Sequence, residues 1–200
     1  MYRAYEEIDL GGGYSQRIYS GYKDKAWYWY LNGKLHREDG PAIECSNGYK
    51  AWYINGKSLR EDGPTVEHAD GSKAWWLNGK LHREDGPAVE DADGTKEWWL
   101  NGKRHREAGP AVENADGTKA WYINGKQHRE DGPAIEYANG SKEWCLNGIE
   151  VTAETIGFII KRKRKLALKY WLLWTDYVMN PTTERGRRYA NRQYDKLEHI

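Results

Sequence analysis

The sequence predicts a mainly β protein: a single-layer twisted array of stacked antiparallel β-hairpins, a solenoid, followed by a C-terminal α-helical segment. An Asn-Gly dipeptide recurs at an unbroken interval of 23 residues, which is typical of a repeat architecture. A second Asx-Gly dipeptide lies inside each interval, between runs rich in β-branched and aromatic residues, and this pattern predicts hairpins. After about residue 152 the period is lost and apolar residues recur at helical spacing. The Asn-Gly pairs begin at Asn32, Asn55, Asn78, Asn101, Asn124 and Asn147.

Composition leaves most function classes open, but the charge is unevenly distributed. The 200 residues have a formal net charge of +1, which gives the whole chain no particular affinity for nucleic acid. Residues 151–200 contain 11 Lys/Arg and 5 Asp/Glu, a net of +6, whereas residues 1–150 have a net of −5. Such asymmetry is typical of a basic tail, or of two segments that attract each other. Eleven Trp and fifteen Tyr beside one Phe suit a thin structure with half-exposed rings.

The two cysteines, Cys45 and Cys145, are expected to be free thiols. They lie four repeats apart, which at two strands of about 4.8 Å per repeat is on the order of 40 Å. A disulfide needs Cα atoms within about 7 Å. Free thiols fit a cytoplasmic protein, in the host cytoplasm if a bacteriophage encodes the chain. The first residues lack the apolar core of a signal peptide, and no apolar run approaches ~20 residues, so we expect no transmembrane segment.

Residues 1–31 are expected to cap the N-terminal end of the array. They are rich in Tyr, and residues 14–18 and 22–30 can pair as a degenerate hairpin around Ser20 and Gly21. The terminal units of a solenoid usually depart from the repeat because their outer edge faces water.

Residues 32–148 form the predicted array, with five units and the start of a sixth. In one unit, Asp93-Gly94 predicts a two-residue type I′ loop that joins residues 87–92 to residues 95–100. The Asn-Gly-Lys motif that follows is expected to end the hairpin and to begin the link to the next unit.

This register decides which residues share a face of the sheet. With Asp93 and Gly94 as the loop, Val89 faces Trp98 across the hairpin. Alternation then predicts a buried face of Val/Ile, Trp and Leu/Ile, represented in this unit by Val89, Trp98 and Leu100. The other face is expected to be half exposed and is represented by Ala88, Glu90 and Trp99.

A row of rings on the half-exposed face is the candidate protein-binding strip: Tyr53, Trp76, Trp99 and Tyr122. We add the positions at the hairpin tips, whose residue type varies while the frame does not: Cys45, His68, Asp91, Asn114 and Tyr137. The alternative, equally supported by the sequence, is that the rings only cover neighbouring backbone.

The 23-residue hairpin period, the Gly at the turns and the aromatic residue on the second strand resemble the MORN repeat family. The resemblance covers residues 32–148. Where the usual family pattern has Gly-x-Gly after a charged link, these units have Asp-Gly-Pro-Ala, as in residues 39–42. They are more similar to a Trp-rich variant common in uncharacterised bacteriophage and bacterial proteins. The resemblance implies an elongated twisted sheet that acts as a scaffold or binding module.

Residues 149–200 are expected to form a basic amphipathic helix and a tail. Thr152 suits the N-cap, Glu154 suits the first turn, and Asn180-Pro181 should end the helix. We expect the five charges of residues 161–165 to spread around the helix, because consecutive residues are about 100° apart. The structural interpretation, which we favour at this point, is that the helix packs on the array, whose negative charge attracts it.

The same segment also supplies candidate contacts to a partner or to nucleic acid. Cations beside rings can bind phosphates and stack on bases. A basic amphipathic helix can instead lie on an anionic membrane, or place its apolar stripe in the groove of a protein. The candidate residues are Lys161, Arg162, Lys163, Arg164, Lys165, Lys169, Trp171, Trp174, Arg185, Arg187, Arg188 and Arg192.

The motif His-Arg-Glu-Asp is the strongest candidate for chemistry, and we expect it to be structural. It is complete at residues 36–39, 82–85 and 128–131 and degenerate at residues 59–62 and 105–108. Equivalent residues of adjacent units lie roughly 10 Å apart, whereas zinc ligands lie within about 2.3 Å of the ion. An active site also needs one asymmetric pocket. We therefore expect Arg and Asp to pair between units, and predict no catalytic residue, metal, cofactor or enzymatic activity.

These patterns favour a non-enzymatic protein-binding repeat module. The resemblance to bacteriophage proteins suggests an inhibitor of a host enzyme or defence protein as its role. Nucleic-acid binding through the basic C-terminal segment is the first alternative, and peripheral membrane attachment by the same helix is the second. Open sheet edges also allow a homodimer.

Overall fold

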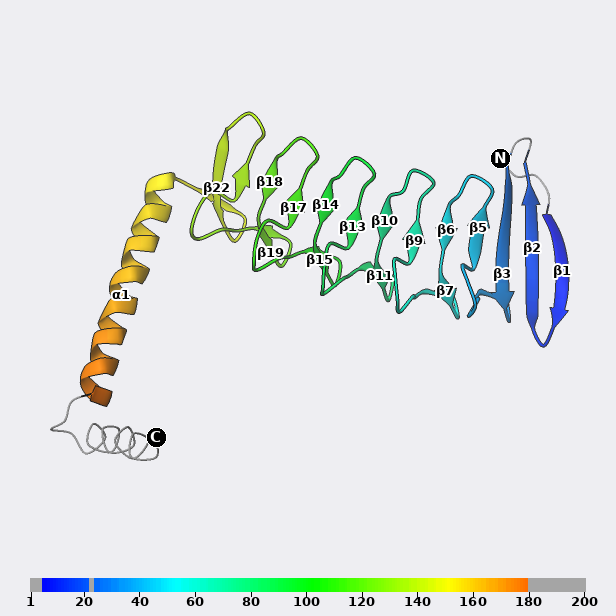
Figure 1. The fold of residues 1–200 in the computed structure, drawn as a ribbon, viewed down its shortest axis with the longest axis horizontal. Coiled ribbons are helices and arrows are strands. Elements are labelled where there is room, and N and C mark those ends of the chain that lie inside the picture. Colours follow the sequence, from blue (N-terminus) through cyan, green and yellow to red (C-terminus); the bar gives the residue numbers. More distant parts are fainter. Residues whose placement is uncertain (1–4, 22–23, 180–200) are drawn as a thin grey trace, which may run out of the picture. The chain divides into compact units, whose positions relative to one another are not determined.

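The computed structural model describes residues 5–21 and 24–179, with side chains described as far as residue 170. It confirms the predicted fold class: consecutive hairpins form a 15-stranded antiparallel sheet that does not close, and one helix follows (Figure 1). The chain divides into two compact units, the hairpin array and the helix with residues 130–132. Each unit is described by itself.

The N-terminal part of the array is a three-stranded meander. The strands are β1 (Tyr5–Gly11), β2 (Tyr14–Ser20) and β3 (Lys25–Leu31), and they pair in chain order. The predicted pairing of β2 with β3 is confirmed, whereas β1 is a strand that the sequence pattern did not reveal. Residues 11–13, three glycines, turn the chain between β1 and β2 with φ between 60° and 83°, a conformation that other residues rarely adopt.

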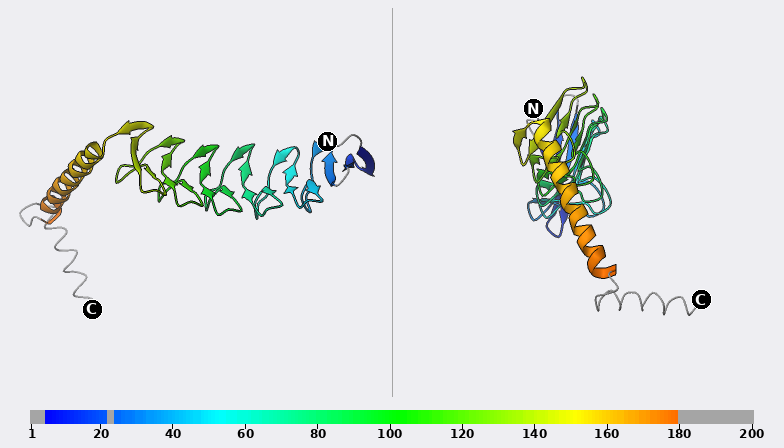
Figure 2. Two further views of the ribbon diagram at one scale, coloured as in Figure 1. Left: turned by 90° about the horizontal axis from the view of Figure 1, so that it is seen from above. Right: turned by 90° about the vertical axis from the view of Figure 1, so that its left-hand side faces the viewer.

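Each repeat unit contributes a large hairpin to the sheet and a small hairpin that continues from it. In one unit the large hairpin consists of β13 (Val89–Glu90) and β14 (Lys96–Glu97), and the small one of β15 (Trp99–Leu100) and β16 (Lys103–Arg104). The large hairpins pair in chain order and form a single layer (Figure 2). The remaining strands are β4 (Lys34–Leu35), β5 (Ile43–Cys45), β6 (Lys50–Ala51), β7 (Tyr53–Ile54), β8 (Lys57–Ser58), β9 (Val66–Glu67), β10 (Lys73–Ala74), β11 (Trp76–Leu77), β12 (Lys80–Leu81), β17 (Val112–Glu113), β18 (Lys119–Ala120), β19 (Tyr122–Ile123), β20 (Lys126–Gln127), β21 (Ile135–Glu136), β22 (Lys142–Leu146) and β23 (Ile149–Val151).

The loop of the large hairpin is longer than predicted. Asp91 N–H donates to Thr95 O and Gly94 N–H donates to Asp91 O, both at 2.9 Å, so Ala92, Asp93 and Gly94 form the loop. Gly94 has a positive φ but Asp93 does not, whereas a type I′ turn needs two such residues. Asp93 acts through its side chain instead, since its Oδ1 accepts from Thr95 N–H at 2.8 Å. The predicted two-residue loop at Asx-Gly is therefore wrong.

The type I′ turn lies at the other dipeptide, Asn-Gly. Asn101 (φ 52°) and Gly102 (φ 77°) are both left-handed, and Leu100 pairs with Lys103 across them. All six Asn of these dipeptides have φ between 50° and 54°. The Asn-Gly motif is thus the tip of the small hairpin, and the link to the next unit begins only after that hairpin.

The longer loop shifts the register by one residue and reverses the expected faces. Val89 pairs with Glu97, not with Trp98. Because side chains alternate along a strand, the shift places Trp98 on the face of Glu90 and leaves Val89 on the face of Glu97 and Trp99. The predicted face that combined Val89 with Trp98 is therefore wrong.

A small, deeply buried residue lies where each large hairpin begins, at a position that we expected to be half exposed. Ala88 N–H donates to Glu97 O, and Ala88 O accepts from Trp75 N–H, both at 2.8 Å, so this residue lies between two units. Leu100, expected to be buried, is only half-buried, because a single layer has no second layer to cover a long side chain. The residues at this position are Ala42, Ala88, Ala111 and Ala134 at 0 % exposure and Thr65 at 2 %, and Ala26 and Ala51 elsewhere in the sheet are also at 0 %.

The helix α1 (Ala153–Met179) begins and ends near the predicted residues. Thr152 is its N-cap as expected, because Thr152 Oγ1 accepts from Thr155 N–H at 3.3 Å. Ile156 is buried, whereas residues 161–170 are all exposed. None of the described helical residues forms a segment both long and apolar enough to cross a membrane.

Candidate binding surface

One face of the array, which we call the ladder face, carries Glu90, Trp98 and their counterparts in other units. On this face an Arg from each link lies over a Trp, with the guanidinium carbon 3.7–4.2 Å from the ring centroid. The quadrupole of the indole attracts a cation placed over its face. The pairs are Arg37–Trp29, Arg60–Trp52, Arg83–Trp75, Arg106–Trp98 and Arg129–Trp121.

Arg83 shows what this arginine does in a unit. Its guanidinium stacks on Trp75, and its Nη1 donates to Pro87 O at 3.2 Å and to Glu90 Oε1 at 3.1 Å. Its Nε donates to Asp85 Oδ1 at 3.0 Å, and this hydrogen bond and charge hold the pKa of the Asp85 carboxyl below its usual range. This Arg–Asp pair lies within one link, so the expected pairing between units is wrong. Stacking on Trp75 joins Arg83 to the preceding unit instead.

The imidazoles of the same motif connect adjacent units by hydrogen bonds. His82 Nδ1 accepts from Asn101 N–H at 3.2 Å, which requires that Nδ1 carry no proton. Residue 59 is Leu, so one unit lacks this connection. Within the described residues, no group of three or more His, Cys, Asp or Glu is arranged to hold a metal ion. The other bonded pairs are His36–Asn55, His105–Asn124 and His128–Asn147.

The opposite face, which we call the ring face, carries Val89, Glu97, Trp99 and their counterparts. All four rings of the predicted strip lie on it and are half-buried: Tyr53, Trp76, Trp99 and Tyr122. They share this face with the Val/Ile positions, contrary to the predicted arrangement; Tyr122, for example, packs against Val112 and Ile135. Trp99 Nε1 donates to Glu97 Oε2 at 2.7 Å.

The residue that pairs with each ring across the small hairpin decides how much space separates it from the next ring. Arg104, the partner of Trp99, lies 5.1 Å from the Trp99 centroid and 5.6 Å from the Tyr122 centroid, and its Nη2 donates to Glu97 Oε1 at 2.8 Å. Gln127, the partner of Tyr122, donates to Tyr122 Oη at 3.3 Å. These long side chains fill the gaps beside their rings.

The gap beside Tyr53 is open, because its partner is Ser58. A groove of about 780 Å³ lies between Tyr53 and Trp76, with Val66 and Ala74 also lining it. We call this groove the ring slot. Ala74 stands where the next unit has Glu97, so Trp76 has no equivalent carboxylate to accept from its indole N–H. The slot is also lined by Tyr49, Gly56, Lys57, Ser58, His68, Asn78 and Gly79.

The five tip positions begin the loops of the large hairpins and lie in line with the Val/Ile positions of the ring face. His68 lines the ring slot, and its ring meets Tyr49 edge-on at 5.4 Å between centroids. Tyr137 Oη donates to Glu143 Oε1 at 2.8 Å. The loops begin at Cys45, His68, Asp91, Asn114 and Tyr137.

Both cysteines are free thiols, as predicted. Cys45 is half-buried and Cys145 is buried, and burial raises the pKa of each thiol. Neither has the lowered pKa of a reactive nucleophile.

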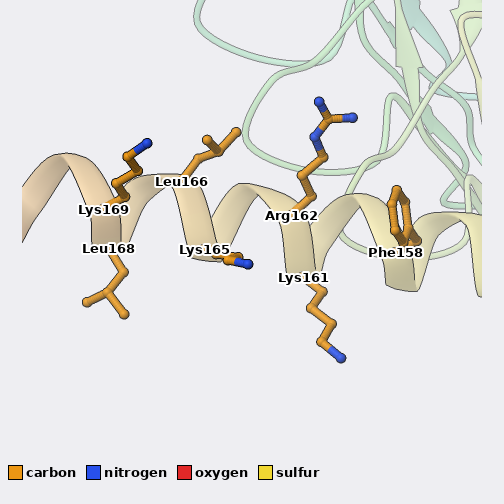
Figure 3. A pocket seen from close by; sticks show the side chains of 7 residues that line it. All are labelled: Phe158, Lys161, Arg162, Lys165, Leu166, Leu168 and Lys169. Atoms are coloured by element: carbon orange, nitrogen blue, oxygen red, sulfur yellow. The ribbon is translucent and has the colours of Figure 1, made fainter.

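Of the five charges of residues 161–165, three line one surface of α1 and two do not, so they spread around the helix as expected. Lys161, Lys165 and Lys169 are spaced by four residues and therefore share one side of the helix, together with Arg162 and Phe158. Figure 3 shows these side chains on an open surface, which Leu166 and Leu168 also line.

The other predicted contact residues of this segment either do not line this surface or lie outside the described residues. Lys163 and Arg164 do not line the surface of Figure 3, and Lys163 forms an ion pair with Glu130 within the helical unit. The backbone of Trp171 and Trp174 belongs to α1, but their side chains lie outside the described part of the chain. The same holds for the whole of Arg185, Arg187, Arg188 and Arg192.

Comparison with protein-family models and with curated protein sequences finds no match, so the resemblance to MORN repeats remains a prediction.

The residues that create the ring slot were not among the predicted site residues. Ser58 is small at a repeat position where other units have Leu, Arg, Gln or Glu, and Ala74 lies at a position that is either Ala or Glu. A comparison of the units position by position would have found them, but only with the correct register, which decides that these positions face the rings.

Proposed function

We propose that this chain is a non-enzymatic protein-binding module whose ring face contacts the partner. The contrast between the two faces supports this proposal most directly. On the ladder face, the Arg83 guanidinium stacks on the Trp75 ring and donates hydrogen bonds to Pro87 and Glu90, so it is already paired within the chain. On the ring face, Tyr53 and Trp76 border an open slot. Large rings beside a groove are the side chains that dominate the binding energy of protein interfaces.

The partner in this proposal is a host enzyme or defence protein that the chain inhibits by covering part of its surface, with a bacteriophage as the source of the chain. The support for this step is the similarity of the repeats to the Trp-rich bacteriophage variant, which is an argument by analogy. A second copy of the chain is the competing protein partner, because β1 is a seven-residue edge strand and one of its sides pairs with no other strand of residues 5–21 and 24–179.

Affinity purification from the cells in which the protein is naturally produced tests the proposal. The wild-type chain is compared with a ring-face variant, Trp76→Ala with Trp99→Ala, and with a ladder-face control, Lys73→Ala with Lys96→Ala. We expect a co-purifying protein, identified by mass spectrometry, that the ring-face variant loses and the control retains. Equal recovery with all three, or no partner with any, contradicts the proposal. Circular dichroism establishes that each variant is folded.

Nucleic-acid binding is the second candidate, and the surface of α1 in Figure 3 favours it. Lys161, Arg162, Lys165 and Lys169 are exposed on this surface, with Phe158 among them. Cations next to an exposed ring suit phosphates and bases. A helix that lies on a membrane separates its polar and apolar faces, whereas here the cations and apolar side chains are mixed.

Fluorescence anisotropy with labelled single-stranded DNA and RNA tests this candidate across a salt series. Binding that weakens steeply with salt, and that is lost when Lys161, Lys165 and Lys169 are replaced by Gln, supports it. Absence of binding at low salt excludes it. Flotation with liposomes that contain anionic lipid distinguishes membrane attachment from both.

A further inference from the structure

We propose that the ring slot binds a proline-rich peptide segment in the polyproline II conformation, with acidic residues facing the lysines at its rim. The inference rests on the proposed function, because it names the chemistry of the segment by which a protein partner is recognised. Four properties of the slot lead to it.

The first property is the apolar lining between two rings. Tyr53 and Trp76 border the slot, and the side chains of Val66 and Ala74 line it with them. Aromatic-lined grooves of this kind take proline side chains, because a polyproline II segment is already ordered and loses little entropy on binding.

The second property is an excess of hydrogen-bond donors. The Trp76 indole can only donate, and the ammonium group of Lys57 can only donate. A peptide bond that precedes proline offers a carbonyl oxygen and no N–H, so a proline-rich segment presents acceptors where this slot presents donors. In the next unit the corresponding indole, that of Trp99, already donates to Glu97, so it is not available to a bound peptide.

The third property is the period of the array. Successive rings are one unit apart, which at two strand spacings is about 9.6 Å. A polyproline II helix has three residues per turn and rises ~3.1 Å per residue, or about 9.3 Å per turn. A segment that runs across the strands therefore presents an equivalent side chain to each successive unit, and the mismatch is only about 0.3 Å per unit.

The fourth property is a row of lysines along the small-hairpin tips. Lys34, Lys57 and Lys80 are exposed, and they follow the Asn-Gly turns at the same interval as the rings. Lys57 lines the slot, and the aliphatic parts of Lys34 and Lys80 lie against the turn glycine of the following unit. In a three-fold helix, an acidic residue at every third position faces this row, while the prolines between them face the rings.

The equivalent position in neighbouring units shows which larger residue can replace Ser58 without disturbing the fold. Residues 35 and 81, the equivalents of Ser58, are both Leu. Ser58→Leu should therefore fold normally and fill the slot. Its urea unfolding midpoint, compared with that of the wild type, shows that the fold is retained. Ala74→Glu is a second variant, which supplies the Trp76 indole with the carboxylate that Trp99 already has.

The test is a titration of the full chain, monitored by Trp fluorescence and by isothermal calorimetry. The probe is a synthetic peptide of five Glu-Pro-Pro repeats, and the controls are five Glu-Gly-Gly repeats and oligo(dT) of fifteen nucleotides. We expect saturable binding of the proline peptide, at least tenfold weaker binding of the glycine peptide, and at least tenfold weaker binding of the proline peptide to both variants.

Each other outcome overturns a defined part of the proposal. Equal affinity for the two peptides removes the preference for polyproline II. Unchanged affinity in Ser58→Leu removes the slot as the site. Binding of oligo(dT) that Ser58→Leu abolishes makes the slot a nucleic-acid site instead. If the proline peptide does not bind but a partner is still lost with the ring-face variant, the inference fails while the proposed function stands.

Discussion

Replacing Arg83 by Ala tests whether the Arg–Trp ladder holds the repeat units together. The substitution removes a cation 4.0 Å from the Trp75 centroid and the hydrogen bonds to Pro87 and Glu90. A half-exposed cation–π contact contributes about 0.5–1 kcal/mol. The hydrogen bond from a charged donor to the Pro87 carbonyl contributes about 1 kcal/mol. The ion pair with Glu90 contributes at most about 0.5 kcal/mol, because solvent screens a pair that is a quarter to a third exposed.

The expected loss is therefore about 1.5–2.5 kcal/mol of unfolding free energy. Urea denaturation followed by Trp fluorescence measures it, and Arg83→Lys should lose most of the same amount, because an ammonium group cannot stack and donate in two directions at once. Asp85→Asn is the comparison, since that carboxylate is exposed and its loss should lower the midpoint much less than Arg83→Ala does. An Arg83→Ala midpoint equal to that of the wild type would refute the argument that this ladder stabilises the array.

Three further predictions concern the repeat frame. Leu59→His should raise the unfolding free energy by about 0.5–1.5 kcal/mol in urea denaturation, because it supplies the missing acceptor for Asn78 N–H; a decrease would contradict the role given to the imidazoles. Ala88→Leu should cost about 1–3 kcal/mol by overpacking, whereas Ala88→Thr should be tolerated as Thr65 is, and equal thermal midpoints for the two would contradict the assignment of a fully covered site. The lowered pKa of Asp85 stabilises the fold above its usual value of about 3.9, and this contribution is lost as pH falls through the lower folded-state pKa. The urea midpoint of the wild type should therefore fall more between pH 5 and pH 3 than that of Asp85→Asn, and parallel declines would contradict it.

The period of the sequence was sufficient to predict the fold class, because a 23-residue unit with two Asx-Gly turns has few stable arrangements other than stacked hairpins. It was not sufficient to assign the turns. Both dipeptides have the same local preference for a two-residue turn, and the structure uses it only at the Asn-Gly of residues 101–102. At residues 93–94 the Asp93 side chain accepts a hydrogen bond from the backbone N–H of Thr95, which favours the longer loop.

The wrong loop length predicted at Asx-Gly explains why the two faces of the sheet were assigned incorrectly. Because the loop has one extra residue, Val89 pairs with Glu97 and not with Trp98, and the same shift in pairing occurs in the other repeats. The four rings of the candidate strip were nevertheless chosen correctly as a set that shares one face. The slot beside Tyr53 could not be predicted, because it depends on which side chain lies between two rings from different units.

Site-specific photocrosslinking tests the central claim, that the ring face is the partner-binding face, most directly. The photoreactive residue p-benzoylphenylalanine replaces Tyr53 in one chain and Lys73, on the ladder face, in another. Both chains are irradiated in the cells in which the protein is naturally produced, and the adducts are identified by mass spectrometry. We predict a protein adduct from position 53 that position 73 does not form. An adduct from position 73 alone, or equally from both positions, would contradict the account.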